Sequence, residues 1–181
     1  MAVPELPLRE TKYGLVADGD GWFVLNARES RWRDSGRFGC FCNFEGKRPF
    51  RQLGLNLNVL QPGQSLGLYH RERAQEGFLV LSGECLLIVE GEERRLGPWD
   101  FFYCAPGTEH VIVAGERQSA LVLAVGGRGG RKGLVYLADE VALAHGAAVE
   151  QETTSPSEAY GGFSDWNRCR YGEGWLPEAP G

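Results

Sequence analysis

Two histidines and two glutamates form an ordered array that could bind a metal ion. His70 is followed by Glu72 and Glu76, and His110 lies further along the chain. The chain has only 3 histidines, so the placement of two of them among acidic residues is informative. Imidazole nitrogens and carboxylate oxygens are common ligands of divalent metal ions. The array therefore predicts one divalent metal site, provided that the fold brings these side chains together.

The segment around the first histidine is typical of antiparallel strands joined by short turns. Residues 65–70 and 76–81 are expected strands, and the polar residues between them turn the chain. Side chains at positions i and i+2 of an extended chain share a face, so His70 and Glu72 can point the same way. Further expected strands follow at similar intervals: 53–60, 85–90, 94–96, 99–104, 110–113 and 120–125. Short strands at this spacing indicate an all-β fold.

A strong turn signal precedes the second histidine. The run Ala105-Pro106-Gly107-Thr108 ends the expected strand 99–104, and His110 then begins an apolar strand. A ligand at the mouth of a strand is held on rigid backbone, which suits a metal site.

The two segments resemble the two sequence motifs of the cupin superfamily. The first motif of that family runs from a glycine through His-x-His to a glutamate and a second glycine. The equivalent residues of this chain are Gly63, His70, Glu72, Glu76 and Gly83, so that Glu72 replaces the second histidine.

The second motif of the family runs from a glycine through Pro-x-Gly-x-x-His to an asparagine. Here it reads Gly97, then Ala105-Pro106-Gly107-Thr108-Glu109-His110, and ends on Ala114 in place of the asparagine. Ala105 also departs from the family pattern. The resemblance implies an all-β jelly-roll barrel over about residues 53–126 of a single cupin domain, 1–181. The N-terminal arm is 1–52, and 127–181 is a C-terminal segment with a short helix and an aromatic tail.

The same resemblance implies roles for the four candidate ligands. His70 and His110 would bind one Fe²⁺, Mn²⁺ or Zn²⁺ ion as neutral imidazoles, and Glu76 would bind it as an anion. Three readings stay open for Glu72: a fourth ligand, a nearby general base with a catalytic role, or a solvated carboxylate beside Arg71 and Arg73. The function expected is a metal-dependent enzyme of oxygenase or isomerase type. The alternatives are a non-catalytic ligand-binding or sensor protein and a structural metal site.

Composition limits the other possibilities. The 181 residues suit one domain, and a net charge of −5 argues against a primary nucleic-acid partner. No apolar run approaches the ~20 residues of a membrane helix, and residues 1–8 have no signal-peptide pattern. These features predict a cytoplasmic protein. The 5 cysteines are then expected to be small buried hydrophobic residues.

The flanking segments carry weaker signals. Residues 22–26 and 38–44 are expected strands, and the glycine-rich run 126–133 is an expected loop. Residues 139–144 predict a short helix that His145 ends, and a helical turn is expected near 157–160.

The remaining predictions concern aromatic residues and assembly. The tail is expected to pack on its own barrel or on a partner subunit through Phe163, Trp166, Tyr171 and Trp175. Because exposed sheet edges must be covered, we expect a homodimer in which the arm or the tail crosses the interface. A small molecule is the other expected partner. Strand parity separates Trp99, Phe101 and Tyr103 from Phe102, without saying which face is inside, and Cys104 is expected in the core.

Overall fold

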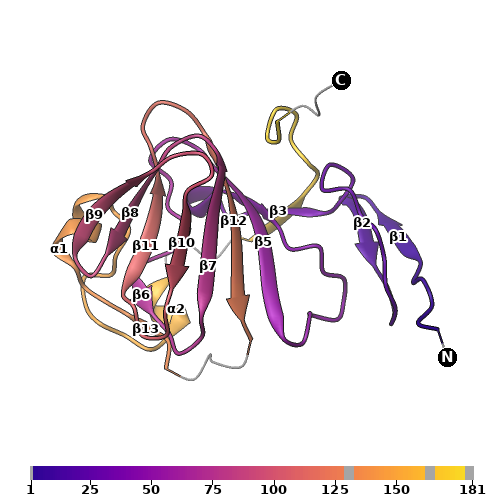
Figure 1. Cartoon of the computed structure of the whole chain (residues 1–181), viewed down its shortest axis with the longest axis horizontal. Helices are drawn as coiled ribbons and strands as arrows, with labels where there is room; N and C mark the ends of the chain where they lie inside the picture. The colour runs from indigo at the N-terminus through magenta and orange to yellow at the C-terminus, as the bar shows by residue number, and fades with distance from the viewer. Residues whose placement is uncertain (1, 129–132, 162–165, 178–181) are drawn as a thin grey trace.

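The computed structural model describes residues 2–128, 133–161 and 166–177 (Figure 1). Almost all regular structure in these residues is β. The strands are β1 (Leu8–Thr11), β2 (Gly14–Ala17), β3 (Trp32–Asp34), β4 (Cys40–Cys42), β5 (Leu53–Leu60), β6 (His70–Arg71), β7 (Glu76–Ser82), β8 (Cys85–Val89), β9 (Glu92–Leu96), β10 (Phe101–Cys104), β11 (His110–Ala114), β12 (Ala120–Gly127), β13 (Val135–Tyr136) and β14 (Asn167–Cys169). A 3₁₀ turn η1 (Gly36–Phe38) and the helices α1 (Glu140–Ala144) and α2 (Pro156–Ala159) complete them.

Two antiparallel sheets face each other. One has the strand order β10-β7-β12-β5-β4-β3-β14, and the other has the order β13-β6-β11-β8-β9. Alternate side chains of both sheets meet in a buried core that includes Val80, Ile112 and Val122. The predicted all-β jelly-roll fold is therefore confirmed.

The strands around the candidate metal ligands agree with the strands predicted from the sequence, with one exception. The strands expected at 53–60, 76–81 and 110–113 are present as β5, β7 and β11. Residues 65–70, however, are not a continuous strand, and only His70 and Arg71 pair as β6. The reason is a turn at Gly67, which has a φ of 143°.

The expected strand at 22–26 is also wrong. Trp22 makes one isolated bridge to Glu5, and residues 23–26 have no strand partner. The chain turns immediately afterwards, where the amide of Ser30 donates to the carbonyl of Asn26. Apolar side chains alone do not form a strand when no neighbouring strand is available to pair with them.

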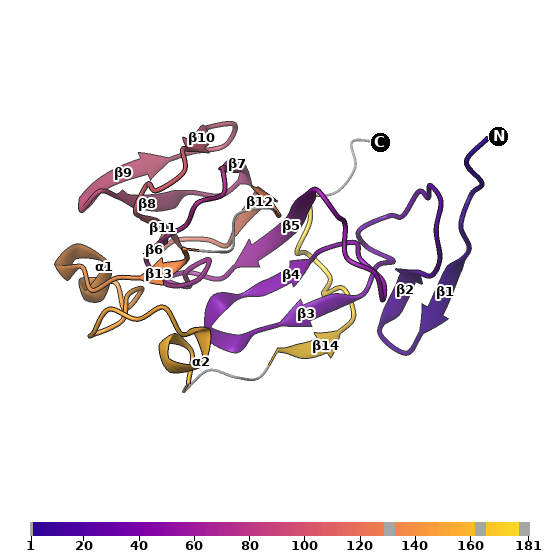
Figure 2. The same cartoon turned by 90° about the horizontal axis from the view of Figure 1, so that it is seen from below.

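The seven-stranded sheet extends beyond the barrel strands through segments from both ends of the chain. β4 pairs with β5, β3 pairs with β4, and β14 from the C-terminal segment pairs with β3. Figure 2 shows these strands continuing the sheet, with the separate β1–β2 hairpin beyond them.

The aromatic tail covers one half of the outer face of this sheet. The ring of fully buried Trp32 lies 6.0 Å from that of Tyr171 and 5.1 Å from that of Trp175. Trp166 packs edge-on against Phe41 at 5.2 Å on the opposite face, because Phe41 alternates with the outer-facing Cys42. The tail thus packs on its own chain, while Phe163 lies outside the described residues.

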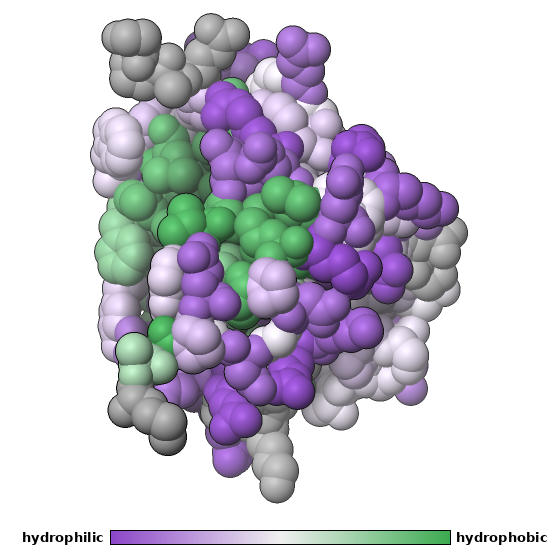
Figure 3. Space-filling view, turned by 90° about the vertical axis from the view of Figure 1, so that its right-hand side faces the viewer, coloured by the Kyte–Doolittle hydropathy of each residue, from purple (hydrophilic) through white to green (hydrophobic). Residues whose placement is uncertain are grey.

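Among the described residues, none covers the other half of the outer face, which is called the bare half below. Phe102 and Cys104 point into the barrel, whereas Trp99, Phe101 and Tyr103 are 74%, 63% and 55% exposed. A groove beside Phe101 is lined mainly by apolar residues of β5, β7 and β12, among them Leu79, Leu123 and Val125. Figure 3, viewed from the right-hand side of Figure 1, shows a hydrophobic area bordered by hydrophilic residues.

The C-terminal segment agrees with the helix predictions. Asp139 caps α1 by accepting a hydrogen bond from the amide of Ala142, and His145 ends the helix. α2 is the expected second helical turn. No helix in the described part of the chain is long and apolar enough to cross a membrane. Of the glycine-rich loop predicted at 126–133, residues 129–132 lie outside the described ranges.

Candidate metal centre

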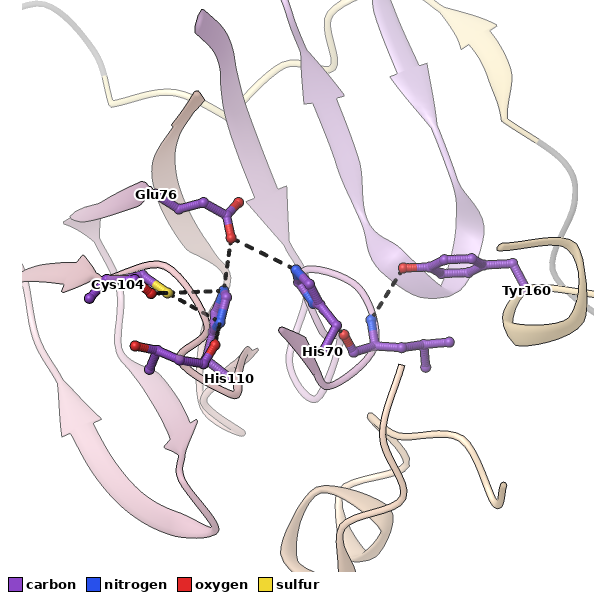
Figure 4. Close-up of polar contacts among 8 residues, drawn as sticks. His70, Glu76, Cys104, His110 and Tyr160 are labelled. Atoms are coloured by element: carbon purple, nitrogen blue, oxygen red, sulfur yellow. Dashed lines mark hydrogen bonds and ion pairs between the residues drawn. The ribbon is translucent and has the colours of Figure 1, made fainter. Parts of the chain in front are cut away.

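Three side chains from three strands converge between the sheets. His70 of β6 and His110 of β11 lie directly opposite each other on paired strands, and their ring centroids are 4.7 Å apart. Glu76 begins β7 in the facing sheet. Its Oε2 lies 3.3 Å from Nε2 of His110 and 3.8 Å from Nε2 of His70. Figure 4 draws both contacts as dashed lines. One potential ligand atom from each of the three residues lies within 4.8 Å of the others.

The backbone fixes the orientation of both imidazoles. Nδ1 of His70 lies 2.7 Å from the carbonyl oxygen of Leu68, and Nδ1 of His110 lies 3.1 Å from that of Thr108. A carbonyl oxygen only accepts hydrogen bonds, so each Nδ1 carries the proton and donates it. The lone pair of each neutral ring is then on Nε2, on the side of Glu76. Histidine ligands of metals are commonly held by such a contact at the other nitrogen.

The carboxylate of Glu76 is ionised and lacks a hydrogen-bond donor. Burial raises the pKa of this carboxyl, but hydrogen bonds from the protonated imidazoles of His110 and His70 and their positive charge outweigh burial and lower the pKa to about 2. Oε2 is nevertheless buried without a hydrogen-bond partner. A buried anionic oxygen facing two nitrogen lone pairs is unfavourable by itself and is satisfied by a cation. The donor set of these residues therefore fits a divalent metal.

Protonation of His70 opposes metal binding. Burial lowers the pKa of His70, but a protonated ring would donate a hydrogen bond to Glu76 and be attracted by its charge, and together these raise the pKa above its ordinary value. A proton on Nε2 of His70 would occupy the lone pair that a metal needs.

Glu72 lies next to this group but does not belong to it. The three residues whose ligand atoms lie within 4.8 Å of one another are His70, Glu76 and His110. Glu72 is half-buried, and its charge makes a small contribution to raising the pKa of His70. Its backbone carbonyl accepts a hydrogen bond of 2.7 Å from the amide of Gly107, which joins the loops of the two motifs. Arg71 pairs with Glu109 at 2.6 Å.

Cys104 and two phenylalanines surround His110, a feature that sequence reasoning missed. Sγ of Cys104 lies 3.3 Å from Nδ1 of His110, a contact that the sequence did not predict. Burial raises the pKa of the thiol to about 12, so it stays protonated, as a core residue would. The rings of Phe78 and Phe102 lie 5.4 Å and 5.7 Å from the His110 ring. The strand register of the structure explains the contact, because Cys104 lies directly opposite Glu76, which itself contacts His110.

A residue of the C-terminal segment supports the loop before His70. The hydroxyl of Tyr160, which follows α2, accepts a hydrogen bond of 3.4 Å from the amide of Leu68. Leu68 is the residue whose carbonyl orients His70. A Cβ added at Gly67 would lie 3.2 Å from the same hydroxyl, so the glycine makes room for it. Nothing in the local sequence links these residues, because they are 92 positions apart.

His145 lies away from this centre. Its Nε2 is 2.8 Å from a carboxylate oxygen of Glu93, at the exposed end of α1. The third histidine of the chain is therefore a helix-end residue, as predicted, and serves as a natural control for the other two.

The motifs and the fold together define a cupin. The family model described as a cupin domain matches residues 56–126, which contain all three converging residues. Residues 56–126 are therefore a cupin domain.

Individual relatives are more distant. Dimethylsulfoniopropionate lyase DddQ of Ruegeria pomeroyi is 30% identical over 132 residues, which cover 64% of this chain and 63% of the lyase. The match thus spans less than two thirds of that protein. The polyketide cyclase RemF of Streptomyces resistomycificus has a similar fold, with 17% identity, a TM-score of 0.53 and coverage of 66% of this chain and 90% of RemF. A cupin-superfamily sugar phosphate isomerase of Silicibacter pomeroyi matches at 24% identity and a TM-score of 0.44, covering 56% and 62% of the two chains.

Proposed function

We propose that this chain is a metal-dependent enzyme acting on a small molecule, with one divalent metal held by His70, Glu76 and His110. One observation carries the proposal: a buried, ionised carboxylate oxygen without a hydrogen-bond partner faces the Nε2 atoms of two histidines. Both rings have their other nitrogen fixed by a backbone carbonyl, so the three potential ligand atoms are already oriented.

Two imidazoles and one carboxylate suit Fe²⁺, Mn²⁺ or Zn²⁺. Three protein ligands leave coordination positions for a substrate oxygen, which is the arrangement of catalytic rather than structural sites. Such a metal, when bound, would polarise a carbonyl or carboxylate oxygen of the substrate. Phe78 and Phe102 would exclude water from the side of His110.

A site with these ligands serves more than one class of reaction. Oxygenase and isomerase types both use sites of this kind, and the likeness to a lyase supports chemistry that needs no external oxidant. In that chemistry a base removes a proton from a substrate held at the metal. Glu72 is the candidate for this catalytic base, since it lies beside His70 and outside the group of three. Its other candidate role is that of a fourth ligand.

The second candidate function is a non-catalytic protein that binds a small ligand, or a sensor, in the same barrel. Metal binding alone does not separate it from an enzyme. A pool of small metabolites incubated with metal-loaded protein separates the two, if mass spectrometry follows both depletion and retention on the protein. Depletion by the wild type but not by His110→Ala supports the enzyme, whereas retention without depletion supports the binding protein.

Metal analysis of protein purified without chelators or a metal-affinity tag tests the centre itself. We expect about one divalent metal per chain in the wild type and in His145→Ala, and loss of metal from His70→Ala and His110→Ala. His145 is the matched control because it is a histidine at the surface, paired with Glu93. A wild-type protein that binds no divalent metal at micromolar affinity would falsify the proposal.

We also propose that the chain forms a homodimer through the bare half of its outer sheet face. The three exposed aromatic residues there offer roughly 400 Å² of apolar surface. The N-terminal arm adds three apolar residues that are at least half exposed: Val3 at 66%, Trp22 at 50% and Val24 at 77%. Together the two surfaces approach the ~800 Å² per partner of a stable interface. Because the tail packs on its own chain, the arm is the segment left to cross to a second copy.

Light scattering tests this assembly. Phe101→Asp and deletion of the first twenty residues should each shift a dimer toward monomer. Leu143→Asp is the control, since Leu143 is an exposed apolar residue on α1, outside the groove. A wild-type monomer at high concentration, unchanged by the deletion, contradicts the dimer.

The unpaired state of the five cysteines supports a further proposal, a reducing cytoplasmic location. Cell fractionation tests this location.

A further inference from the structure

Two arginines lie directly opposite each other at the far end of the seven-stranded sheet. Arg33 of β3 and Arg168 of β14 are register partners. Their sequence neighbours Trp32 and Cys169 pack into the apolar cluster on the outer face. Since successive side chains of a strand alternate, both arginines point to the opposite face. Like charges directly opposite on neighbouring strands destabilise a sheet unless something compensates them.

The described part of the chain provides no such compensation. None of its carboxylates forms an ion pair with Arg33 or Arg168. Nε of Arg33 is buried without a hydrogen-bond partner. The carboxylate of Glu45 is occupied by Arg128 at 2.6 Å. A buried guanidinium N–H without an acceptor is as unusual as a buried carboxylate oxygen without a donor.

A third arginine adds to the positive charge. Arg31 donates a hydrogen bond of 2.9 Å to the backbone carbonyl of Glu45, so this contact leaves its charge without an anionic partner. Burial lowers the pKa of Arg31, and the charges of Arg33 and Arg168 lower it further. The chain carries more acidic than basic residues, 24 against 19, so three neighbouring arginines without an ion-paired carboxylate among the described residues are not a consequence of composition.

An aromatic pair borders the arginines. Phe41 of β4 is the register partner of Arg33 on its other side, and Trp166 packs edge-on against it. Trp166 is 46% exposed. Apolar rings beside a guanidinium reduce its access to water and strengthen its interaction with an anion.

We propose that Arg33 and Arg168 form a binding site for the carboxylate or phosphate group of a small molecule. The planar guanidinium matches two oxygens of either group at once, and an anion between the arginines would remove their repulsion.

This site is separate from the metal centre. β3, which carries Arg33, lies four strands away from β7, which carries Glu76. Followed across the paired strands, the position of Arg33 corresponds to Val80 of β7, four residues after Glu76. With strands about 4.8 Å apart and a rise of about 3.3 Å per residue, the distance is roughly 23 Å. A single small substrate does not span it, so the proposal stands or falls independently of the metal.

Thermal unfolding in added salts tests the site. We expect the Tm of the wild type to rise and saturate with sodium phosphate or sodium succinate, compared with sodium chloride at equal ionic strength. The salt that saturates at the lower concentration identifies the preferred group. No saturable rise with either salt overturns the proposal.

Variants assign the effect to the arginines. Arg33→Met should weaken the response at least tenfold, without lowering the Tm measured in sodium chloride, because it removes a like-charge contact. If Arg33→Met does not fold, Arg168→Met, at an exposed position, should weaken the Tm response to the anion in the same way. Arg94→Met is the control, since Arg94 lies on β9 of the other sheet, paired with Glu92 at 2.5 Å. An unchanged response in both Arg33→Met and Arg168→Met overturns the proposal, and metal affinity should be unaffected in each.

Discussion

The two ends of the seven-stranded sheet differ in how they use a buried charge. At the β7 end, Oε2 of Glu76 has no hydrogen-bond partner and faces two imidazoles from the opposite sheet. At the β3 end, Nε of Arg33 has no partner and its strand neighbour is another arginine. The buried side-chain atoms without partners among the described residues are these two.

The difference shows what makes each end a candidate site. Around Glu76, ligands of complementary type come from three strands and are held by backbone contacts, so the arrangement suits a cation. Around Arg33, charges of one sign are brought together by strand pairing alone, so the arrangement suits an anion. Oε2 of Glu76 and Nε of Arg33 each lower the stability of the folded protein when nothing is bound. Each site should lose its ligand when the charged side chain is replaced by a neutral one.

Removing the charge of Glu76 should have the largest effect. Glu76→Gln keeps the shape of the side chain, and its amide can donate a hydrogen bond to an Nε2 lone pair. We expect metal affinity to fall by more than roughly 100-fold, since even residues outside the ligand shell contribute 10–100-fold. The Tm of the metal-free protein should not fall. Isothermal titration and thermal unfolding measure the two effects.

Glu93→Gln is the matched control for that substitution. Glu93 is an exposed carboxylate that also contacts a histidine, His145. It should leave metal affinity unchanged. Equal losses in the two variants would show that the effect is not specific to the converging group, and the contrast between the two ends of the sheet would fail.

For His70, the stability of the metal-free protein and the affinity for metal should depend on pH with opposite signs. The folded state raises the pKa of His70 above 6.5, so its contribution to metal-free stability is full below pH 6.5 and is lost as the pH rises through the folded pKa. Glu76 contributes above pH 4.5, and this contribution is lost as the pH falls toward 2.

Metal affinity should instead rise with pH up to the raised pKa of His70, by about tenfold per pH unit for one displaced proton. Denaturant unfolding of the metal-free protein and metal titration, both at several pH values, check the two signs. Parallel trends would mean that His70 does not lose a proton on binding.

Substitution of Glu72 decides between its roles. If Glu72 is a ligand, Glu72→Ala should weaken metal binding by tenfold or more, about 1.4 kcal/mol. Glu72→His should then keep the site and shift its preference toward later transition metals. If Glu72 is a base, metal affinity should hold while turnover falls. Titration of Mn²⁺, Fe²⁺ and Zn²⁺ against the wild type and both variants gives the answer, and unchanged affinities throughout remove Glu72 from the ligand set.

The smallest effect should come from Tyr160. Tyr160→Phe removes only the hydroxyl that accepts from the amide of Leu68. We expect a stability loss of about 0.5–1.5 kcal/mol, typical of one hydrogen bond, and a few-fold loss of metal affinity through a less well-oriented His70. Tyr103→Phe, at an exposed position on β10, is the control. A loss of stability with no change in metal affinity would make Tyr160 a purely structural residue.

Much of the fold could be read from periodicity and turn residues. The strands β5, β7, β11 and β12, the helix α1 and the end of that helix at His145 were all expected. The errors at 22–26 and 65–70 have a common cause, because strand formation depends on a partner as well as on the residues of the strand itself. Trp22 finds only a bridge, and Gly67 turns the chain before β6 can begin.

The sequence by itself determined which residue types are available for metal binding and their order, His70, Glu76 and His110, because turn chemistry and strand alternation act locally. Only the tertiary structure decided how they are used. It brought Glu76 from the facing sheet onto two Nε2 atoms, placed the thiol of Cys104 beside His110, and set Arg168 opposite Arg33. These contacts join residues of different strands, and they exist because two sheets bury a common core, which no local pattern encodes.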